Sequence, residues 1–191
     1  MITFERSFDY DLIRSVLTHP RLYRYLADDT SPPAYEFTPQ QHPAIWYVTV
    51  RDDRELLGLW MFVPQNGVCW EVHTALLPNA WGERGQLAAR LLPGWMWRNT
   101  SCRRIVSNVP TTNRLALHFA LKAGMKIFGV NEASFLKNGV LCDQVMLGIS
   151  KPFKVPIADD GIGLESIAVA IAEALEPPKE EACQQPQFCH S

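Results

Sequence analysis

The sequence predicts an α+β fold in which one mixed, mostly antiparallel sheet carries helices on both faces. Residues 45–77 contain three strand-like runs joined by short polar turns, a pattern typical of antiparallel pairs. Residues 105–125 read as a buried strand, a turn and a helix. Two further strand-like runs flank Asn138-Gly139, a strong signal for a two-residue hairpin turn. Strands and helices mixed in this way within 191 residues favour a single sheet.

The first elements are a short strand over residues 2–6 and two short helices. Asp9 is suited to cap the first helix, which ends at His19-Pro20. Residues 21–26 form the second helical segment, and the proline-rich stretch after it, to Pro43, is predicted to be irregular. The apolar stripe of the first helix comprises Leu12, Ile13, Val16 and Leu17.

Three antiparallel strands are predicted in the middle of the chain, over residues 45–51, 55–62 and 68–77. Turn residues at Asp52-Asp53-Arg54 and Gln65-Asn66-Gly67 join them. A helix over residues 85–99 follows. Its residues expected to face the sheet are Leu87, Leu91, Leu92, Trp95 and Met96.

The strand–helix unit at 105–125 has clear boundaries. Pro110 closes the strand, and Thr112 is expected to cap the helix. Gly124 ends the helix where a left-handed residue is needed. Residues 126–133 and 140–150 then close the sheet as a hairpin. The apolar face of the helix comprises Leu115, Ala116, Phe119 and Ala123.

The end of the chain is predicted to be separate from this domain, which spans residues 1–151. Residues 152–176 read as a linker and an amphipathic helix, and residues 177–191 as a polar, disordered tail. The helix is expected to dock on its own domain, or alternatively to contact a partner or a second copy. Its apolar face comprises Leu164, Ile167, Ala168, Ile171 and Leu175.

Composition narrows the function classes. A net charge of −2 and a pI near 6.2 give no electrostatic argument for binding nucleic acid or an anionic membrane. The five cysteines are scattered and contain no Cys-x-x-Cys pair, which predicts reduced thiols and no metal site. Charged residues interrupt the first twenty positions, and no apolar run approaches the roughly 20 residues of a membrane-spanning helix. The sequence therefore predicts a soluble cytoplasmic protein.

Two short motifs carry a family resemblance. Asn113-x-x-Ala116, followed by Lys122-x-Gly124-Met125, resembles the Asn-x-x-Ala … Lys-x-Gly-Phe strand–helix unit of the GNAT acyl-CoA N-acyltransferases. The predicted order β-α-α-β-β-β-α-β-α-β-β is similar to that family over about residues 1–150. The resemblance implies a GNAT-like fold, acetyl-CoA as cofactor and acyl transfer to an amine.

The resemblance also implies where the pyrophosphate of acetyl-CoA lies. Family members hold it on backbone amides of an Arg/Gln-x-x-Gly-x-Gly/Ala loop that opens a helix. Here Trp81 falls on the first position of that loop, and Arg84 and Gln86 on the two small-residue positions. The Arg84 guanidinium is expected to contact phosphate, and Gly82 and Gly85 to keep the loop flexible. The implied pyrophosphate-binding residues are Trp81, Gly82, Glu83, Arg84, Gly85 and Gln86.

The thioester is implied to lie where the central strands separate. Main-chain amides near Leu76 and Leu77 are expected to hold its carbonyl, and Asn113 to lie near the pantetheine arm. Asn113 has a second interpretation as a helix cap.

Two titratable side chains are candidate catalytic residues. Glu71 and His73 alternate onto one face of the third central strand. A carboxylate on this strand is the family's usual base, so the resemblance implies that role for Glu71. His73 is the second candidate, since a free imidazole has a pKa near ~6.5. Alternatively, both side chains face solvent or pair with a neighbouring strand. The family's tyrosine acid is replaced by Ala120, so a general acid has to come from elsewhere or from water.

Candidate acceptor-binding residues lie in the loop after the second helix and in the last hairpin. A cationic amine would suit Asp28, Asp29 and Glu36, and the alternative is that these side chains belong to a solvated loop. Further candidates are Tyr23, Tyr25, Tyr35, residues 131–135 and Asp143. The acceptor is expected to be a small molecule, a protein N-terminus or a lysine.

Two functions remain open. The first is transfer of an acetyl group from acetyl-CoA to a primary amine. The second is a non-catalytic GNAT-fold protein that acts as a phage assembly or virion-associated structural component, located in the host cytoplasm or the virion and able to contact a virion partner. Three segments resemble GNAT-like proteins of tailed phages and prophages: residues 71–78, Asn113-Arg114-x-Ala116 and Ser134-Phe135-x-x-Asn138-Gly139.

Overall fold

The computed structural model describes residues 1–152, which group into one compact unit, Met1–Pro152. The predicted helix within 152–176 and the predicted tail at 177–191 lie outside the described residues. None of the helices in the described part of the chain is both long and apolar enough to cross a membrane.

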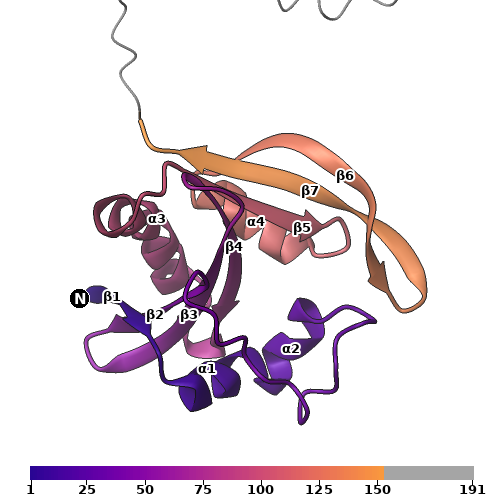
Figure 1. Ribbon diagram of the computed structural model, residues 1–191, viewed down its shortest axis with the longest axis horizontal. Coiled ribbons are helices and arrows are strands. Elements are labelled where there is room, and N and C mark those ends of the chain that lie inside the picture. The colour runs from indigo at the N-terminus through magenta and orange to yellow at the C-terminus, as the bar shows by residue number, and fades with distance from the viewer. Residues whose placement is uncertain (153–191) are drawn as a thin grey trace, which may run out of the picture. The chain divides into compact units, whose positions relative to one another are not determined.

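A seven-stranded sheet forms the centre of the unit, in the order β1-β2-β3-β4-β5-β7-β6 (Figure 1). All neighbouring strands are antiparallel except β4 and β5, which are parallel. The predicted single mixed sheet is therefore confirmed. The strands are β1 (Ile2–Ser7), β2 (Trp46–Asp52), β3 (Glu55–Pro64), β4 (Cys69–Leu76), β5 (Arg104–Pro110), β6 (Lys126–Lys137) and β7 (Val140–Ser150).

Helices cover both faces of the sheet, as predicted. Consecutive side chains of a strand point to opposite faces, and the neighbours Tyr47 and Val48 belong to different core clusters. Tyr47 packs with α1 (Tyr10–Leu17) and α2 (Pro20–Leu26), whereas Val48 packs with α3 (Glu83–Asn99). The remaining helices are η1 (Pro78–Ala80) and α4 (Arg114–Lys122).

Local sequence signals account for several element boundaries. The Asp9 side chain accepts a hydrogen bond from the Leu12 amide and caps α1, as predicted. Gly124 follows α4 with φ +96°, the left-handed conformation that glycine adopts readily. Asn138 and Gly139 both have positive φ, as a two-residue hairpin turn requires.

Helices α4 and α3 do not begin where the sequence predicted. Asn113 caps α4 instead of Thr112, because a Pro110–Asn113 turn delays the helix and brings the Asn113 side chain to the Ala116 amide at 3.1 Å. Helix α3 begins at Glu83 instead of residue 85, because Gly82, with φ +98°, supplies the turn that starts it.

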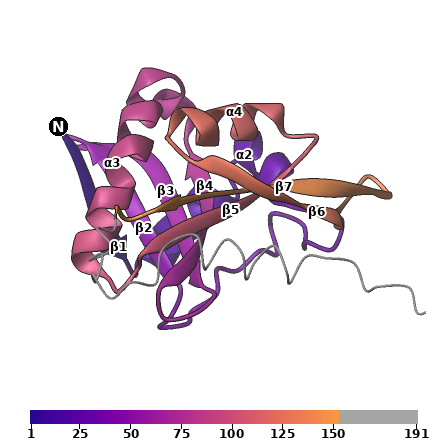
Figure 2. The same ribbon diagram turned by 90° about the horizontal axis from the view of Figure 1, so that it is seen from above.

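Strand β6 is longer than predicted. It continues to Lys137 because Ala133, with φ +47°, forms an irregularity that shifts the register without ending the pairing with β7. The hairpin extends beyond the other strands (Figure 2). Asp29, in the loop after α2, accepts hydrogen bonds from the Asn138 and Gly139 amides at its tip. Hydrogen bonds therefore connect the loop after α2 to the turn of the β6–β7 hairpin.

Candidate active site

Strands β4 and β5 pair over only three residues before they separate. The paired positions are Cys69–Arg104, Trp70–Ile105 and Glu71–Val106. Just beyond them, the Ser107 hydroxyl donates to the Val72 carbonyl at 3.3 Å. The C-terminal half of β4 is therefore unpaired on its β5 side, and we call this interval the β4–β5 opening.

Backbone polar groups of β4 face this opening. The Leu77 amide donates to the Leu57 carbonyl of β3 at 2.9 Å. Because consecutive residues of a strand direct their amide and carbonyl groups to opposite neighbours, those of Leu76 point away from β3 and into the opening. The structure thus places Leu76 at the opening, as the family resemblance implied, while the Leu77 amide is used by β3.

The side chain of Trp81 lies at the β4–β5 opening, beside Leu76. Its indole Nε1–H donates to the Leu76 carbonyl at 2.9 Å, and the Arg21 guanidinium carbon lies 4.6 Å from the ring centroid. The side chain is 48% exposed. Trp81 therefore occupies the carbonyl that the opening would offer to a ligand. Of the other tryptophans, Trp95 packs against the main core cluster.

Glu71 stands at the point where the two strands separate. Its Oε1 accepts a hydrogen bond from Asn108 Nδ2 of β5 at 3.0 Å. Its Oε2 accepts one from Gln65 Nε2, in the β3–β4 turn, at 3.3 Å. The side chain keeps 21% exposure. An amide from each side thus fixes the carboxylate.

His73 lies two residues after Glu71 on β4 and therefore on the same face of the strand. Its Nε2 is 3.9 Å from Glu71 Oε1, and its side chain is 45% exposed. Surrounding protein atoms desolvate the imidazole and lower its pKa below the ordinary 6.5, while the Glu71 carboxylate opposes this by raising it. Ala75, the next residue on this face, packs with the α1–α2 cluster, so the pair lies on the face that α1 and α2 cover.

The start of α3 contains the loop expected to bind pyrophosphate. No side chain caps this helix, and a Cβ at Gly82 would meet nothing within 4 Å. The amides of a first helical turn have no partners inside the helix, so they are suited to an anion. Gly85 has a different role from Gly82, because a Cβ there would lie 2.6 Å from the Ala80 carbonyl oxygen. Gly85 permits close packing of α3 on η1.

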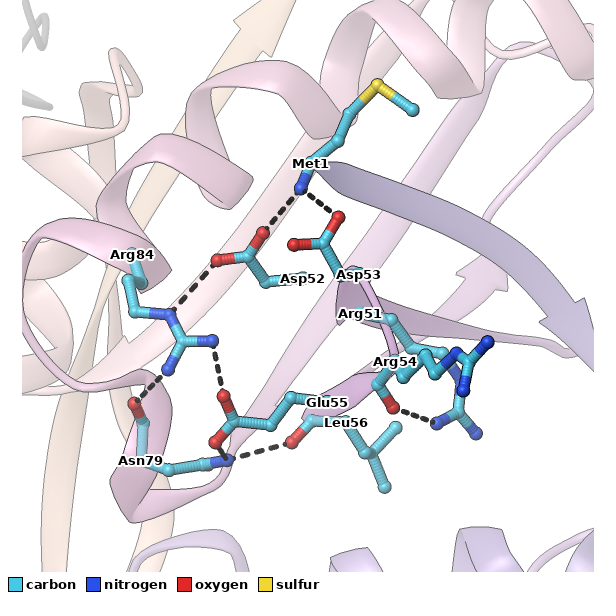
Figure 3. Close-up of polar contacts among 9 residues, drawn as sticks. All are labelled: Met1, Arg51, Asp52, Asp53, Arg54, Glu55, Leu56, Asn79 and Arg84. Atoms are coloured by element: carbon cyan, nitrogen blue, oxygen red, sulfur yellow. Dashed lines mark hydrogen bonds and ion pairs between the residues drawn. The ribbon is translucent and has the colours of Figure 1, made fainter.

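The side chain of Arg84 does not follow the expectation that it contacts phosphate. Its Nη2 pairs with Glu55 at 2.6 Å and its Nε with Asp52 at 3.3 Å (Figure 3). Asp52 also receives the Met1 ammonium at 2.8 Å. The Arg84 guanidinium holds the pKa of Glu55 below its usual value. Two carboxylates of the β2–β3 hairpin occupy the guanidinium, so only the backbone amide of Arg84 stays a candidate ligand.

The remaining predicted cofactor residues differ in what they offer. Gln86 donates from Nε2 to the Phe119 carbonyl at 3.4 Å, and its Oε1 is buried without a hydrogen-bond partner within residues 1–152. Glu83 is exposed in the first turn of α3. The Asn113 oxygen is used as the cap of α4, which leaves its amide nitrogen for a ligand.

The acidic loop residues predicted for acceptor binding have structural partners. Asp29 binds the hairpin amides described above. Asp28 accepts hydrogen bonds from Thr30 and Ser31, which lower its pKa. Tyr23 donates to the Pro32 carbonyl. These contacts show structural roles for Asp28, Asp29 and Tyr23 within the loop and toward the hairpin, and they do not test whether the loop binds an acceptor.

Sequence reasoning missed Asn108 and Gln65, the two partners of Glu71. One signal was available: Ser107-Asn108 is a polar pair inside an otherwise apolar strand, and buried polar side chains need partners. No comparable signal marks Gln65, which reads as an ordinary turn residue.

Comparisons with known proteins agree with the architecture. The chain is similar to spermidine N-acetyltransferase from Vibrio cholerae in complex with CoA and spermine, with 18% identity, a TM-score of 0.65 and coverage of 78% of this chain and 95% of that one. It is similar to the ribosomal-protein-S5-alanine acetyltransferase from Vibrio fischeri, with 16% identity, a TM-score of 0.60 and coverage of 79% and 94%. A GNAT-family acetyltransferase from Streptococcus pneumoniae gives 15% identity, a TM-score of 0.59 and coverage of 80% and 100%.

At these identities the similarity shows the fold, and the chain has the GNAT fold. No family model matches the sequence, and no curated protein matches it.

Proposed function

We propose that this protein transfers an acetyl group from acetyl-CoA to a primary amine. The observation that carries the proposal is the β4–β5 opening, with Glu71 and His73 at the point where the strands separate. An opening in the sheet exposes strand amides to an extended ligand, and the two side chains supply proton acceptors beside it.

Acetyl-CoA would be held by backbone groups. The Leu76 amide, directed into the opening, is suited to the thioester carbonyl, whose oxygen gains negative charge during attack. The amides at the start of α3, from Gly82 to Gly85, are suited to the pyrophosphate, whereas the Gln86 amide donates to the Gly82 carbonyl at 3.1 Å. Asn113, at the start of α4, is the proposed contact for the pantetheine arm.

The chemistry requires a neutral amine. A primary ammonium first loses one proton to the Glu71–His73 pair, and its lone pair then attacks the thioester carbon, forming the C–N bond. The tetrahedral intermediate collapses as the C–S bond breaks and the thiolate leaves. The second proton of the nitrogen passes to the thiolate through water, since Ala120, buried in the core of the unit, cannot donate one.

The acceptor class follows from the site and the structural neighbours. A carboxylate at the opening favours an amine that arrives as a cation. The neighbours are named for spermidine and for the alanine of ribosomal protein S5. We therefore propose polyamines and peptide N-termini as the first acceptors to test, with the cytoplasm, where acetyl-CoA is available, as the location. The similar solved structures described above are all named as acetyltransferases, and they give no support to the non-catalytic phage alternative.

The proposal is tested by calorimetry followed by an activity assay. Acetyl-CoA is titrated into the full chain, and acetylation of spermidine, spermine, lysine and an alanine-initiated peptide is followed by mass spectrometry. We expect saturable binding and transfer to at least one acceptor. The double variant Glu71→Gln/His73→Gln should bind acetyl-CoA within about twofold of wild type and lose at least about 100-fold in kcat.

Glu5→Gln is the matched control, because Glu5 is an exposed carboxylate on β1, at the opposite edge of the sheet from the β6–β7 hairpin. It should match wild type in both assays. Absence of binding up to millimolar acetyl-CoA would contradict the proposed function.

A further inference from the structure

The two titratable groups at the opening are not in equivalent environments. Both carboxylate oxygens of Glu71 accept an amide N–H, Oε1 from Asn108 and Oε2 from Gln65. Each carboxylate oxygen therefore already has a hydrogen-bond donor from the protein. These two donors also fix the orientation of the carboxylate, because one amide comes from β5 and the other from the β3–β4 turn.

The imidazole of His73 has the opposite character. It forms no hydrogen bond with any of residues 1–152, and it is more than twice as exposed as Glu71, 45% against 21%. A neutral imidazole carries one nitrogen with a free lone pair. His73 is therefore the group of this pair with an unused proton-accepting atom within reach of solvent and of an incoming amine.

From this geometry we propose that His73 receives the proton of the acceptor amine, and that Glu71, held by Asn108 and Gln65, acts as the fixed anion beside it. The proposal rests on the proposed function and divides its proton-accepting pair into two roles. Asn108 and Gln65 are positioning residues, since they act through Glu71.

The proton steps balance in this assignment. One proton moves from the ammonium to the imidazole, and the resulting imidazolium faces the Glu71 carboxylate, whose Oε1 lies 3.9 Å from Nε2. The free amine attacks the thioester, and the leaving thiolate takes the second nitrogen proton. His73 then releases its proton to solvent, which restores the starting state of the enzyme. The products are one N-acetylated amine, one CoA thiol and one proton.

The electrostatic surroundings agree with these roles. Glu71 is the charged group that acts on His73 among the described residues, and it raises the imidazole pKa against the larger lowering by desolvation. The net lowering keeps His73 neutral at pH 7, the form that accepts a proton. A carboxylate fixed nearby stabilises the imidazolium at the moment when it forms.

The coupling can be measured without any acceptor. The chain has five histidines, so the His73 imidazole resonance is assigned by its loss in His73→Gln and followed through a pH titration by NMR. We expect a midpoint below 6.5, and a further decrease of about 0.5–1 unit in Glu71→Gln. A His73 midpoint unchanged by Glu71→Gln would overturn the pairing.

The positioning role is tested in the same titration. Asn108→Leu and Gln65→Leu each remove one donor that fixes the carboxylate beside the imidazole, so the His73 midpoint should fall by part of the decrease expected in Glu71→Gln. Gln65 lies in a turn and can be replaced without disturbing a strand, which keeps the test valid if Asn108→Leu fails to fold. Gln41→Leu, at an exposed loop amide, is the control and should leave the His73 midpoint unchanged. A His73 midpoint that Gln65→Leu leaves unchanged would overturn the positioning role.

Kinetic measurements distinguish the role of His73 from that of Glu71. They use whichever of spermidine, spermine, lysine and the alanine-initiated peptide the wild type acetylates fastest. His73→Gln should lose about 100-fold or more in kcat and Glu71→Gln about 10-fold, both with the KM for acetyl-CoA unchanged. The acid limb of kcat/KM should move with the His73 midpoint measured by NMR. A larger loss of kcat in Glu71→Gln than in His73→Gln would overturn this assignment and leave the proposed function intact. An acid limb of kcat/KM that does not follow the His73 midpoint would do the same. Absence of acetyl-CoA binding or of any transfer by wild type would overturn both.

Discussion

The Leu76 carbonyl has a hydrogen-bond partner within the protein. Trp81 Nε1 donates to it at 2.9 Å, and Arg21 lies over the indole ring. A ligand that runs along β4 as an extra strand would need the same carbonyl. Under the proposed function, Trp81 therefore competes with the cofactor for one hydrogen bond.

Replacing Trp81 with phenylalanine tests this competition. Trp81→Phe removes the indole N–H, so a carbonyl that an intramolecular bond occupied becomes available to acetyl-CoA. A net hydrogen bond of about 0.5–1.5 kcal/mol corresponds to a roughly two- to tenfold decrease in Kd. Calorimetry with acetyl-CoA measures it. Trp95→Phe, in the core packing of α3, is the control and should leave the Kd unchanged. Weaker binding by Trp81→Phe would mean that the indole belongs to the cofactor site.

Residue roles were predictable where a side chain acts on its own local backbone. Asp9 was recognised as a cap because a helix start needs an acceptor three residues away. The role of Arg84 was not, because its partners Asp52 and Glu55 lie about thirty positions earlier and reach it only after the sheet forms. The contact between Asn108 and Glu71 was hidden for the same reason, since Asn108 belongs to a strand 37 positions later.

At the scale of elements, the start of α3 depends on close contact with β4. A Cβ at Gly85 would lie 2.6 Å from the Ala80 carbonyl oxygen and 3.1 Å from Leu76 Cδ1. The helix whose first turn is the proposed pyrophosphate site therefore rests directly on the strand that carries the proposed thioester contact. Packing at Gly85 sets the distance between the two.

Two glycines of the same helix give a matched test of that packing. Gly85→Ala should lower the free energy of unfolding by about 1–3 kcal/mol, because the added methyl group meets backbone atoms that cannot move aside. Gly94→Ala should raise it by up to about 1 kcal/mol, since its Cβ would meet only the flexible Arg98 guanidinium, at 3.4 Å, and alanine favours a helix. Urea unfolding measures both. Equal effects would show that the contact at Gly85 relaxes freely.

Most elements were predictable because their signals are local, and the errors occur where tertiary contacts decide. The turn at Asn138-Gly139 needs positive φ at both residues, and asparagine followed by glycine is the residue pair that adopts it most readily. The length of β6 was underestimated because pairing with β7 continues past the irregularity at Ala133. The β4–β5 opening was expected from the family resemblance alone, since no periodicity reports how far two parallel strands remain paired.

At the scale of the whole molecule, ionisable groups link distant parts of the chain. Asp52 and Glu55 at the β2–β3 hairpin bind Arg84 at the start of α3, and Asp52 also binds the Met1 ammonium (Figure 3). These contacts lower the pKa of both carboxyls and raise that of the terminal ammonium above 8.0. The dependence of stability on pH follows from the direction of each shift.

Stability should fall on both sides of neutrality. As the pH drops through about 6.5, the unfolded chain protonates before His73 does, because the pKa of His73 is lowered in the folded state. Further acidification below about 4.5 neutralises Asp52 and Glu55, whose lowered pKa values stabilise the fold only above that range. In the alkaline direction, the Met1 ammonium loses its proton above 8.0, and its contribution disappears as the pH passes through its raised folded pKa.

Burial raises the pKa of Cys102 to about 11, so above the ordinary value of 9.0 the unfolded chain ionises this thiol first and unfolding is favoured. We therefore expect the free energy of unfolding to be greatest between about pH 6.5 and pH 8. Urea unfolding followed by tryptophan fluorescence from about pH 3 to pH 10 measures the profile. His73→Gln should remove the first decrease on the acid side and leave the later one, and Cys102→Ala should reduce the alkaline decrease. A stability that rises steadily from pH 5 to pH 10 would contradict the shifts at Met1 and Cys102, and one that does not rise between pH 5 and pH 6.5 would contradict the shift at His73.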